Sequence, residues 1–262
     1  MSSSIISHRT LLPLKKTGIV IFWLMIWQAG SKLVDNPIIL VGPIQVIKAL
    51  IHQSALPGFW QSIGFSFGKI SLGFLIAFIL GILLGSTASR FTFVLELLSP
   101  IMALMKSIPV ASFVVLALIW FGSENLSIFI SFLVVFPMIY MSTIAGINST
   151  DPSLLEMANV FHMSGIKKGY YLYRPALIPY LKSSLNTALG MSFKSGIAAE
   201  VIGVPNHSIG EKLYMAKIYL STADLFAWTL VIIGISFLFE IFFLWLIDRT
   251  VPNHKKSKGR GI

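Results

Sequence analysis

Four charged side chains fall inside or close to long apolar runs of the sequence, where they could bind or guide an ion or a polar solute. They are Lys69, Lys194, Glu200 and Glu240. An unpaired charge near the centre of a membrane helix costs at least about 2.5 to 3.5 kcal/mol, so each of these groups needs a counter-charge or water. Because such residues often mark a route for ions or polar solutes, they are the candidates for a pathway.

These charges suggest different roles. Lys69 and Glu200 lie at similar depth near the outer ends of their runs, which makes them a candidate ion pair. Lys194 could attract an anion. Alternatively, its ammonium could extend to the membrane surface or meet a structural partner. One of these two structural roles is expected for Lys182, which is near the cytoplasmic face. Glu240 has no evident partner at its own depth, and structural, interfacial and proton-linked roles stay open for it.

The motifs of an enzyme are absent from the sequence. No Walker A pattern occurs, and no Ser-His-Asp set or carboxylate pair can be placed together in a water-accessible site. There is no cysteine, which excludes disulfides and thiolate metal ligands. His52 and His207 lack the companion ligands of a metal site. We therefore expect a chain that does not hydrolyse ATP alone and that holds no metal or cofactor.

The composition indicates a protein embedded in lipid. Hydrophobic residues make up 55% of the 262 residues and charged residues 11%, with a mean hydropathy of +0.83, so polar residues are too few to cover a water-soluble globule. A span of about 20 apolar residues crosses the roughly 30 Å hydrocarbon core. We predict an all-α integral membrane protein with about six such helices, at residues 17–34, 60–88, 100–121, 125–147, 177–204 and 224–247.

Glycine and proline predict how two parts of this bundle are shaped. The second span has small residues at three- and four-residue spacing, which lets helix backbones approach closely in lipid and predicts a central packing helix. Its glycines are Gly64, Gly68, Gly73, Gly81 and Gly85. Pro109 and Pro137 interrupt helical runs and predict kinks, which could line a pathway or merely shape the bundle.

Positive charges flank the spans unevenly. If the N-terminus lies inside, only Lys32, Lys48, Lys212 and Lys217 fall on the outer segments, and the other Lys and Arg residues between the spans are cytoplasmic. Topology therefore explains the net charge of +10 better than nucleic-acid binding does. We expect a cytoplasmic segment at 1–16, a membrane domain at 17–248, a cytoplasmic loop at about 151–176 and a basic cytoplasmic tail at 249–262.

The loop at 151–176 is predicted to form a short helix. Asp151 is a plausible N-cap and Pro152 fits the first turn, while Gly165 and Gly169 would end the helix before the next span. A helix that lies on lipid usually carries Lys and Arg on its polar face, whereas residues 152–164 contain Glu156 as their only charged group. Docking into a groove on a partner protein is therefore favoured over a membrane-surface anchor.

The same loop resembles the EAA loop of binding-protein-dependent importer permeases. The match comprises the acidic residue, the second alanine, a small residue and the two closing prolines, namely Glu156, Ala158, Ser164, Pro175 and Pro179. Met157 replaces the first alanine, and His162 stands where the family usually has glycine. Gly165 follows one helical turn later and could supply flexibility there.

Further stretches, in the same order and spacing, resemble the nitrate, sulfonate, taurine and bicarbonate group of permeases from about residue 60 to 249. They read FWQSIGFSFGKISLGFLIAFILGILLG, SPIMALMKSIPVASFVVLALIWFG, FPMIYMSTIAGINSTDPSLLE and ALGMSFKSGIAAEVIG. One departure lies at Val114, Val115 and Leu116, where the group often has a second proline and leucines. This departure weakens the assignment of the chain to any one substrate of the group.

The resemblance implies the permease subunit of a type I ATP-binding-cassette (ABC) importer in a bacterial cell membrane. It implies a small solute such as a sulfonate, nitrate or a related anion, with a vitamin precursor or other heterocycle as the alternative. It also implies a second and identical permease chain, an external substrate-binding protein, and a cytoplasmic ATPase dimer that binds ATP and Mg. The residues that would couple this chain to the ATPase are Glu156, Ala158, His162, Ser164, Gly165, Pro175 and Pro179.

Two other classes of protein compete with this interpretation. A secondary transporter or channel could use Lys194 and Glu240 as coupling charges, but such proteins often contain internal repeats, and no convincing repeat is present. A membrane-embedded enzyme would need a cluster of polar catalytic groups near one face of the membrane, and none is apparent.

Overall fold

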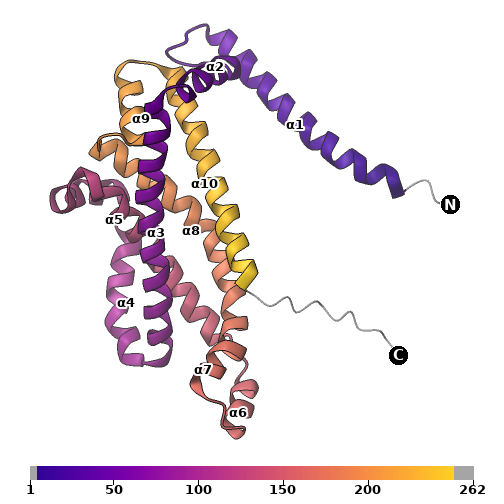
Figure 1. Ribbon diagram of the computed structural model, residues 1–262, viewed down its shortest axis with the longest axis vertical. Helices are drawn as coiled ribbons and strands as arrows, with labels where there is room; N and C mark the ends of the chain where they lie inside the picture. Colours follow the sequence, from indigo (N-terminus) through magenta and orange to yellow (C-terminus); the bar gives the residue numbers. More distant parts are fainter. Residues whose placement is uncertain (1–4, 251–262) are drawn as a thin grey trace.

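The computed structural model describes residues 5–250, and every regular element in that range is helical (Figure 1). The predicted basic tail at 249–262 therefore lies almost entirely outside the described residues. In chain order the elements are α1 (Ile5–Val34), α2 (Pro43–Ser54), α3 (Pro57–Arg90), α4 (Thr92–Ser107), α5 (Val110–Asn148), α6 (Pro152–Val160), α7 (Gly165–Lys168), the π-helical turn η1 (Gly169–Tyr173), α8 (Arg174–Gly203), α9 (Ile209–Ile218) and α10 (Thr222–Thr250).

The prediction of an all-helical membrane protein is confirmed. Within the part of the chain that the structure describes, four helical segments are long and apolar enough to cross a membrane: Thr17–Val34, Pro57–Arg90, Val110–Asn148 and Thr222–Arg249. The predicted span at 177–204 corresponds to α8, which is also long but carries many polar side chains. Both α5 and α8 are joined to the segment at 151–173 at the lower end of the molecule in Figure 1.

The span predicted at 100–121 is wrong in its first part, whereas the span predicted at 125–147 corresponds to the part of α5 that follows Gly122. Pro100 lies inside α4, which ends at Ser107. Pro109 does not kink a continuous helix but lies between α4 and α5 as the N-cap of α5. The reason is that proline disfavours helical backbone at the residue before it, and Ile108 is extended here, with φ −66° and ψ 124°.

A second break lies inside α5. Gly122 has φ 69° and ψ 172°, a conformation that side chains with a Cβ rarely adopt. The segment before it packs against the segment after it, and the rings of Phe121 and Phe129 stack at 4.2 Å between centroids. Gly122 therefore lets the start of α5 turn back onto the rest of the helix.

The centre of the bundle is built by α3, α5 and α8, with α5 packed extensively on both neighbours. Three glycines of α3 permit this approach, because a Cβ on Gly73 would come within 2.3 Å of the Ile128 carbonyl oxygen. A Cβ on Gly81 or Gly85 would meet α5 at 2.9 Å and 2.7 Å respectively. The predicted central packing helix is thus confirmed. Gly64 and Gly68, by contrast, have open space around them.

Helix α1 stands apart from this bundle. It contacts α2 but extends away from α3, α5 and α8, as Figure 1 shows. Only 6% of the span Thr17–Val34 is buried. Helix α10 packs on α8, but only 11% of its most apolar 18-residue stretch is buried. Large apolar faces of α1 and α10 are therefore left to lipid or to another chain.

The glycine contacts give a direct test of the packing. Gly73→Ala should lower the free energy of unfolding by about 1 to 3 kcal/mol, because the added methyl group meets backbone that cannot move aside. Gly68→Ala, on the same helix but in open space, should be neutral or raise it by up to about 1 kcal/mol. Thermal or SDS unfolding of the purified protein measures both, and equal effects would contradict this account of α3.

Candidate functional site

A helical knob formed by α6, α7 and η1 lies at the end of the molecule opposite α2 and α9 (Figure 1). It begins at Asp151, as predicted. The Asp151 carboxylate accepts hydrogen bonds from the Ser153 backbone N–H at 2.9 Å and from the Ser153 hydroxyl at 2.8 Å. These bonds hold the pKa of the Asp151 carboxyl below its usual value. With Pro152 at the first position, the start of α6 is well defined.

The end of α6 explains the residue that departs from the family pattern. His162 has φ +48°, in the left-handed region that usually favours glycine. The Met163 N–H donates to the Ala158 carbonyl at 2.8 Å, and the His162 N–H donates to the Asn159 carbonyl at 3.0 Å. These two bonds form a Schellman cap. His162 thus adopts the turn that a glycine would make, while Gly165 begins α7.

The knob exposes several large apolar side chains, although it lies outside the predicted membrane spans. Val160 and Phe161 are each 75% exposed and Ile166 is 88% exposed. Glu156 is exposed on α6, and Ala158 is buried. An exposed group of large apolar side chains around one acidic residue is typical of a surface that another protein covers.

The two prolines of the loop lie at the start of α8. Pro175 occupies its first turn and Pro179 lies one turn further inside the helix. The π-helical turn η1 comes directly before them and continues into α8 without a break. The Arg174 guanidinium lies over the Tyr170 ring at 4.8 Å, which ties η1 to α8. The knob is therefore joined to α8 through helical backbone.

The predicted ion pair between Lys69 and Glu200 is wrong. The Lys69 ammonium instead donates to the Asn125 side-chain oxygen at 3.0 Å. Glu200 is fully buried, and the Ser66 hydroxyl donates to its carboxylate at 2.6 Å. Similar depth in the membrane did not predict the partner of Glu200. On α3 it is Ser66 that contacts Glu200, whereas Lys69, three residues later, contacts Asn125.

Glu200 joins three helices near the end of the bundle opposite the knob. Its carboxylate accepts from Ser66 on α3 and, at 3.3 Å, from the Gly210 N–H in the first turn of α9. The Ser66 hydroxyl also accepts from the Ile209 N–H at 2.8 Å. A Cβ on Gly210 would come within 2.3 Å of the Glu200 Cβ, so α9 lies directly on α8 here. The role supported for Glu200 is thus structural. Nothing in the residue pattern indicated Ser66 as its partner.

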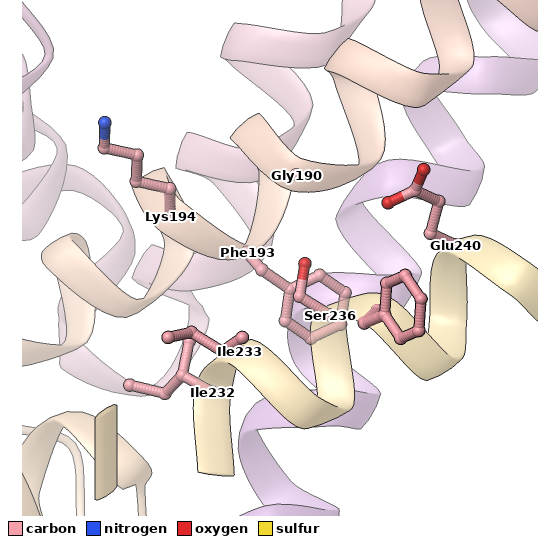
Figure 2. Close-up of a pocket in the computed structure, with 8 residues that line it drawn as sticks. Gly190, Phe193, Lys194, Ile232, Ile233, Ser236 and Glu240 are labelled. Atoms are coloured by element: carbon pink, nitrogen blue, oxygen red, sulfur yellow. The ribbon is translucent and has the colours of Figure 1, made fainter. Parts of the chain in front are cut away.

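Lys194 and Glu240 line one hollow between α8 and α10 (Figure 2). Its volume is about 390 Å³, and the other residues of its wall are Gly190, Phe193, Ile232, Ile233, Ser236 and Phe237. Within residues 17–249 neither charge forms an ion pair or hydrogen bond. By contrast, Lys182 pairs with Asp248 nearer the knob, which confirms the structural partner expected for Lys182.

The exposed side of α8 is polar over several turns. Ser183, Asn186, Thr187 and Lys194 are exposed there, although lipid-facing positions of a spanning helix are normally apolar. This face is therefore better suited to water or to another protein chain than to lipid tails. The structure brings Lys194 and Glu240 to this side, and it places Lys69 and Glu200 elsewhere.

Comparison with known proteins gives a consistent result. A sequence model of the family described as "Binding-protein-dependent transport system inner membrane component" matches residues 73–253. The taurine transport system permease protein TauC of Escherichia coli (strain K12) is 27% identical over 234 residues, covering 87% of this chain and 85% of the relative. The bicarbonate transport system permease protein CmpB of Synechococcus elongatus is 26% identical, covering 90% and 87%. The nitrate import permease protein NrtB of Synechococcus elongatus is 28% identical, covering 69% and 68%.

The cap at His162 can be tested by substitution. His162→Val should open the turn, because a β-branched side chain tolerates the left-handed region poorly, and the Met163 amide should exchange its hydrogen about tenfold faster. His162→Gly should preserve the protection. Ser164→Val is the control, since Ser164 is extended with φ −63° and ψ 153°, and it should leave exchange unchanged. Equal protection in His162→Val would contradict the cap.

The buried carboxylate gives a second test. Glu200→Ala should lower the free energy of unfolding by about 1 to 3 kcal/mol, because Ser66 and the first turn of α9 lose an acceptor. Glu200→Gln keeps one acceptor oxygen and should cost less. Glu96→Ala, at an exposed position of α4, is the control and should have little effect. Thermal unfolding in detergent measures the series, and no difference between Glu200→Ala and Glu96→Ala would exclude the structural role.

Proposed function

Because the chain belongs to the family of binding-protein-dependent transport system inner membrane components, we propose that its knob at residues 151–173 couples it to the ATPase of an ABC importer. As a member of this family the chain is a transport permease and not an enzyme, and it is a multi-pass inner membrane protein. Its importer includes an ATPase and a substrate-binding protein. The observation that supports the coupling role is the exposed apolar surface around Glu156 on α6.

The structure of the knob suits it to transmit a movement. The Schellman cap holds α6 against the turn that follows, and η1 continues directly into α8. At its other side, Asp151 follows α5 after two residues. A displacement of α6 would thus move α5 and α8 together, and these two helices share a very extensive contact. ATP and Mg would act on the partner subunits, whose closure would move the knob as a rigid body.

This proposal fixes an orientation. The knob would lie in the cytoplasm, together with both termini of the membrane domain at 17–248, and α9 and α2 would lie on the outer side. Lys167, Lys168 and Arg174 around the knob agree with an excess of positive charge on the cytoplasmic side. The substrate-binding protein would then approach the end that carries α9.

We further propose that the permease works as two identical chains. Helix α1 extends away from its own bundle, and little of its apolar surface is buried within the chain. A second copy would cover α1 and the polar side of α8, so that the pathway would form between the two bundles. Two copies related by a twofold axis would each present α1 and the polar side of α8 to the other. A second type of permease chain is therefore not needed.

The solute that fits best is a small anion. The three relatives described above are named for taurine, bicarbonate and nitrate transport, and each of these solutes carries an anionic group. Lys194 would offer a positive charge on the polar side of α8. Specificity would rest largely with the substrate-binding protein, which meets the solute first.

Substitution of the acidic residue on the knob tests the coupling. Glu156→Lys should leave the permease folded and membrane-inserted but reduce solute uptake by about tenfold or more, because it reverses the only charge on α6 at the ATPase surface. ATP hydrolysis by the co-purified ATPase should no longer respond to the solute-loaded binding protein. Uptake into proteoliposomes and ATPase rates measure the two effects.

Glu96→Lys is the matched control, because it reverses an exposed acidic residue on α4, outside the knob. It should leave solute uptake and the response of the ATPase unchanged. Normal uptake by Glu156→Lys, or transport by this chain without any ATPase, would overturn the proposed coupling.

A further inference from the structure

Helix α2 is too short to cross a membrane, and it connects two helices that are long enough to do so. Its 12 residues are about 18 Å long, against a hydrocarbon core of roughly 30 Å. The span of α1 ends at Val34 before it, and α3 begins at Pro57 after it. Figure 1 shows α2 at the end of the molecule opposite the knob. The chain therefore has to run along a membrane surface at α2.

One side of α2 is fixed against the bundle. Val46 is fully buried in an apolar cluster with Ala227 of α10, and Leu50 packs against the same cluster. In the next turn of α2, the Gln53 side-chain amide donates to the Asp224 carboxylate at 3.0 Å. These contacts set the rotation of α2 about its own axis, so they decide which of its side chains face away from the bundle.

The sides of α2 that face away from the bundle differ in polarity. Ile44, Ile47 and Ile51 are 58%, 52% and 65% exposed, and their spacing of three and four residues places them on one side of the helix as an isoleucine stripe. Lys48 and His52 are also exposed, and each follows a residue of the stripe and so lies about 100° further around the helix. Helix α2 thus has one side on the bundle, one open apolar side and one open polar side.

Trp60 marks the level of the membrane surface beside α2. It lies in the first turn of α3 and is 64% exposed, and its indole N–H donates to the Ser54 carbonyl at the end of α2 at 3.1 Å. Tryptophan is enriched where lipid headgroups meet acyl chains, because its ring is apolar and its N–H needs a partner. The end of α2 is therefore attached to a spanning helix at the level of the headgroups.

We propose that α2 lies in the plane of the membrane surface, with the isoleucine stripe among the lipid acyl chains and Lys48 and His52 at the level of the phosphate groups. An apolar side next to a basic polar side is the pattern that this boundary selects. Lipid is favoured over a second protein because the stripe lies between two helices that enter the membrane and adjoins Trp60. In the orientation of the proposed function, on which this part of the inference rests, the surface is the outer one.

The position of α2 also bears on α10. The Thr222 hydroxyl at the start of α10 donates to the Ile38 carbonyl in the segment before α2, and Asp224 accepts from Gln53. A helix held by lipid would therefore keep the first turn of α10 at a fixed depth in the membrane.

Spin labels on the full chain in lipid nanodiscs test the proposal. The chain has no cysteine, so Ile47→Cys and His52→Cys each place one nitroxide on α2, in nanodiscs of phosphatidylethanolamine and phosphatidylglycerol. Oxygen collides with a label most often among acyl chains, and a nickel chelate does so in water. The ratio of oxygen to nickel collisions should be about fivefold higher at residue 47, because its label should lie roughly 5 to 10 Å into the boundary of the acyl chains.

The other occupants of the stripe give different results. Equal ratios at residues 47 and 52 would overturn the proposal, because the stripe would then face water. Loss of collisions with both reagents at residue 47 would show that a second copy of the chain covers the stripe. A label at residue 47 that meets water until the substrate-binding protein is added would assign the stripe to that protein, and both of these results would contradict a lipid occupant.

A charge placed on either open side gives an independent measurement. Ile47→Lys should raise the hydrogen-exchange rates of the α2 amides in nanodiscs about tenfold, because the added charge would lie among acyl chains. His52→Lys adds a charge on the polar side and should leave these rates unchanged. Both residues are exposed, so neither change disturbs the packing of Val46. Equal exchange in the two variants would contradict the proposal.

Labelling from one side of the membrane separates this inference from the proposed function. A membrane-impermeant maleimide should modify His52→Cys from outside intact cells. Modification only in inverted vesicles would overturn the outer location of α2 together with the orientation of the proposed function. A high collision ratio at residue 47 combined with normal uptake by Glu156→Lys would reject the coupling role alone and support the position of α2.

Discussion

Hydrocarbon offers no hydrogen bonds, so each polar group inside the bundle must find its partner within the protein. The described bundle meets this constraint only in part, because the buried hydroxyls of Ser62, Ser71, Ser192 and Tyr140 and one carboxylate oxygen of Glu200 have no partner within the chain. The Ser131 hydroxyl donates to the Ser192 carbonyl at 3.2 Å, and the Thr143 hydroxyl donates to the Ile139 carbonyl at 2.8 Å within its own helix. Glu200 is held by Ser66 and the first turn of α9. Gly196 on α8 permits the first of these contacts, because a Cβ there would come within 2.7 Å of the Ser131 hydroxyl oxygen.

The same constraint applies to two charged groups on the open side of the bundle. Lys194 and Glu240 lie on the open side of the α8 and α10 pair, outside the network that holds α3, α5 and α8 together. The proposed coupling acts on this pair as well, because the knob is continuous with α8. A movement that begins at α6 would therefore change the hollow while the glycine contacts keep α3 and α5 together. Transport in this account is a shift between rigid groups of helices rather than a loosening of the bundle.

The pattern of residues along the sequence predicted where the helices lie better than it predicted which side chains contact one another. Apolar length identified α3 and α10, and Asp151 with Pro152 identified the start of α6, because these depend on neighbours along the chain. Pro109 predicted a kink, but not that one helix ends at Ser107 and another begins at Val110, since a run of apolar residues conceals where a helix ends. The pairing of Lys69 with Asn125 was missed for another reason: depth along a helix can be counted, but the direction of a side chain depends on packing. Neither the left-handed turn at His162 nor the hollow shared by Lys194 and Glu240 could be read from one sequence.

The central claim is that α6 lies against the ATPase in the working importer. The chain has no cysteine, so a single Phe161→Cys substitution places a unique thiol on the exposed surface of the knob. Its rate of modification by a membrane-impermeant maleimide can be measured on the purified permease with and without its ATPase. We predict rapid labelling of the permease alone and strong protection in the complex. Equal rates in the two states would show that the knob is not the contact, and would contradict the account.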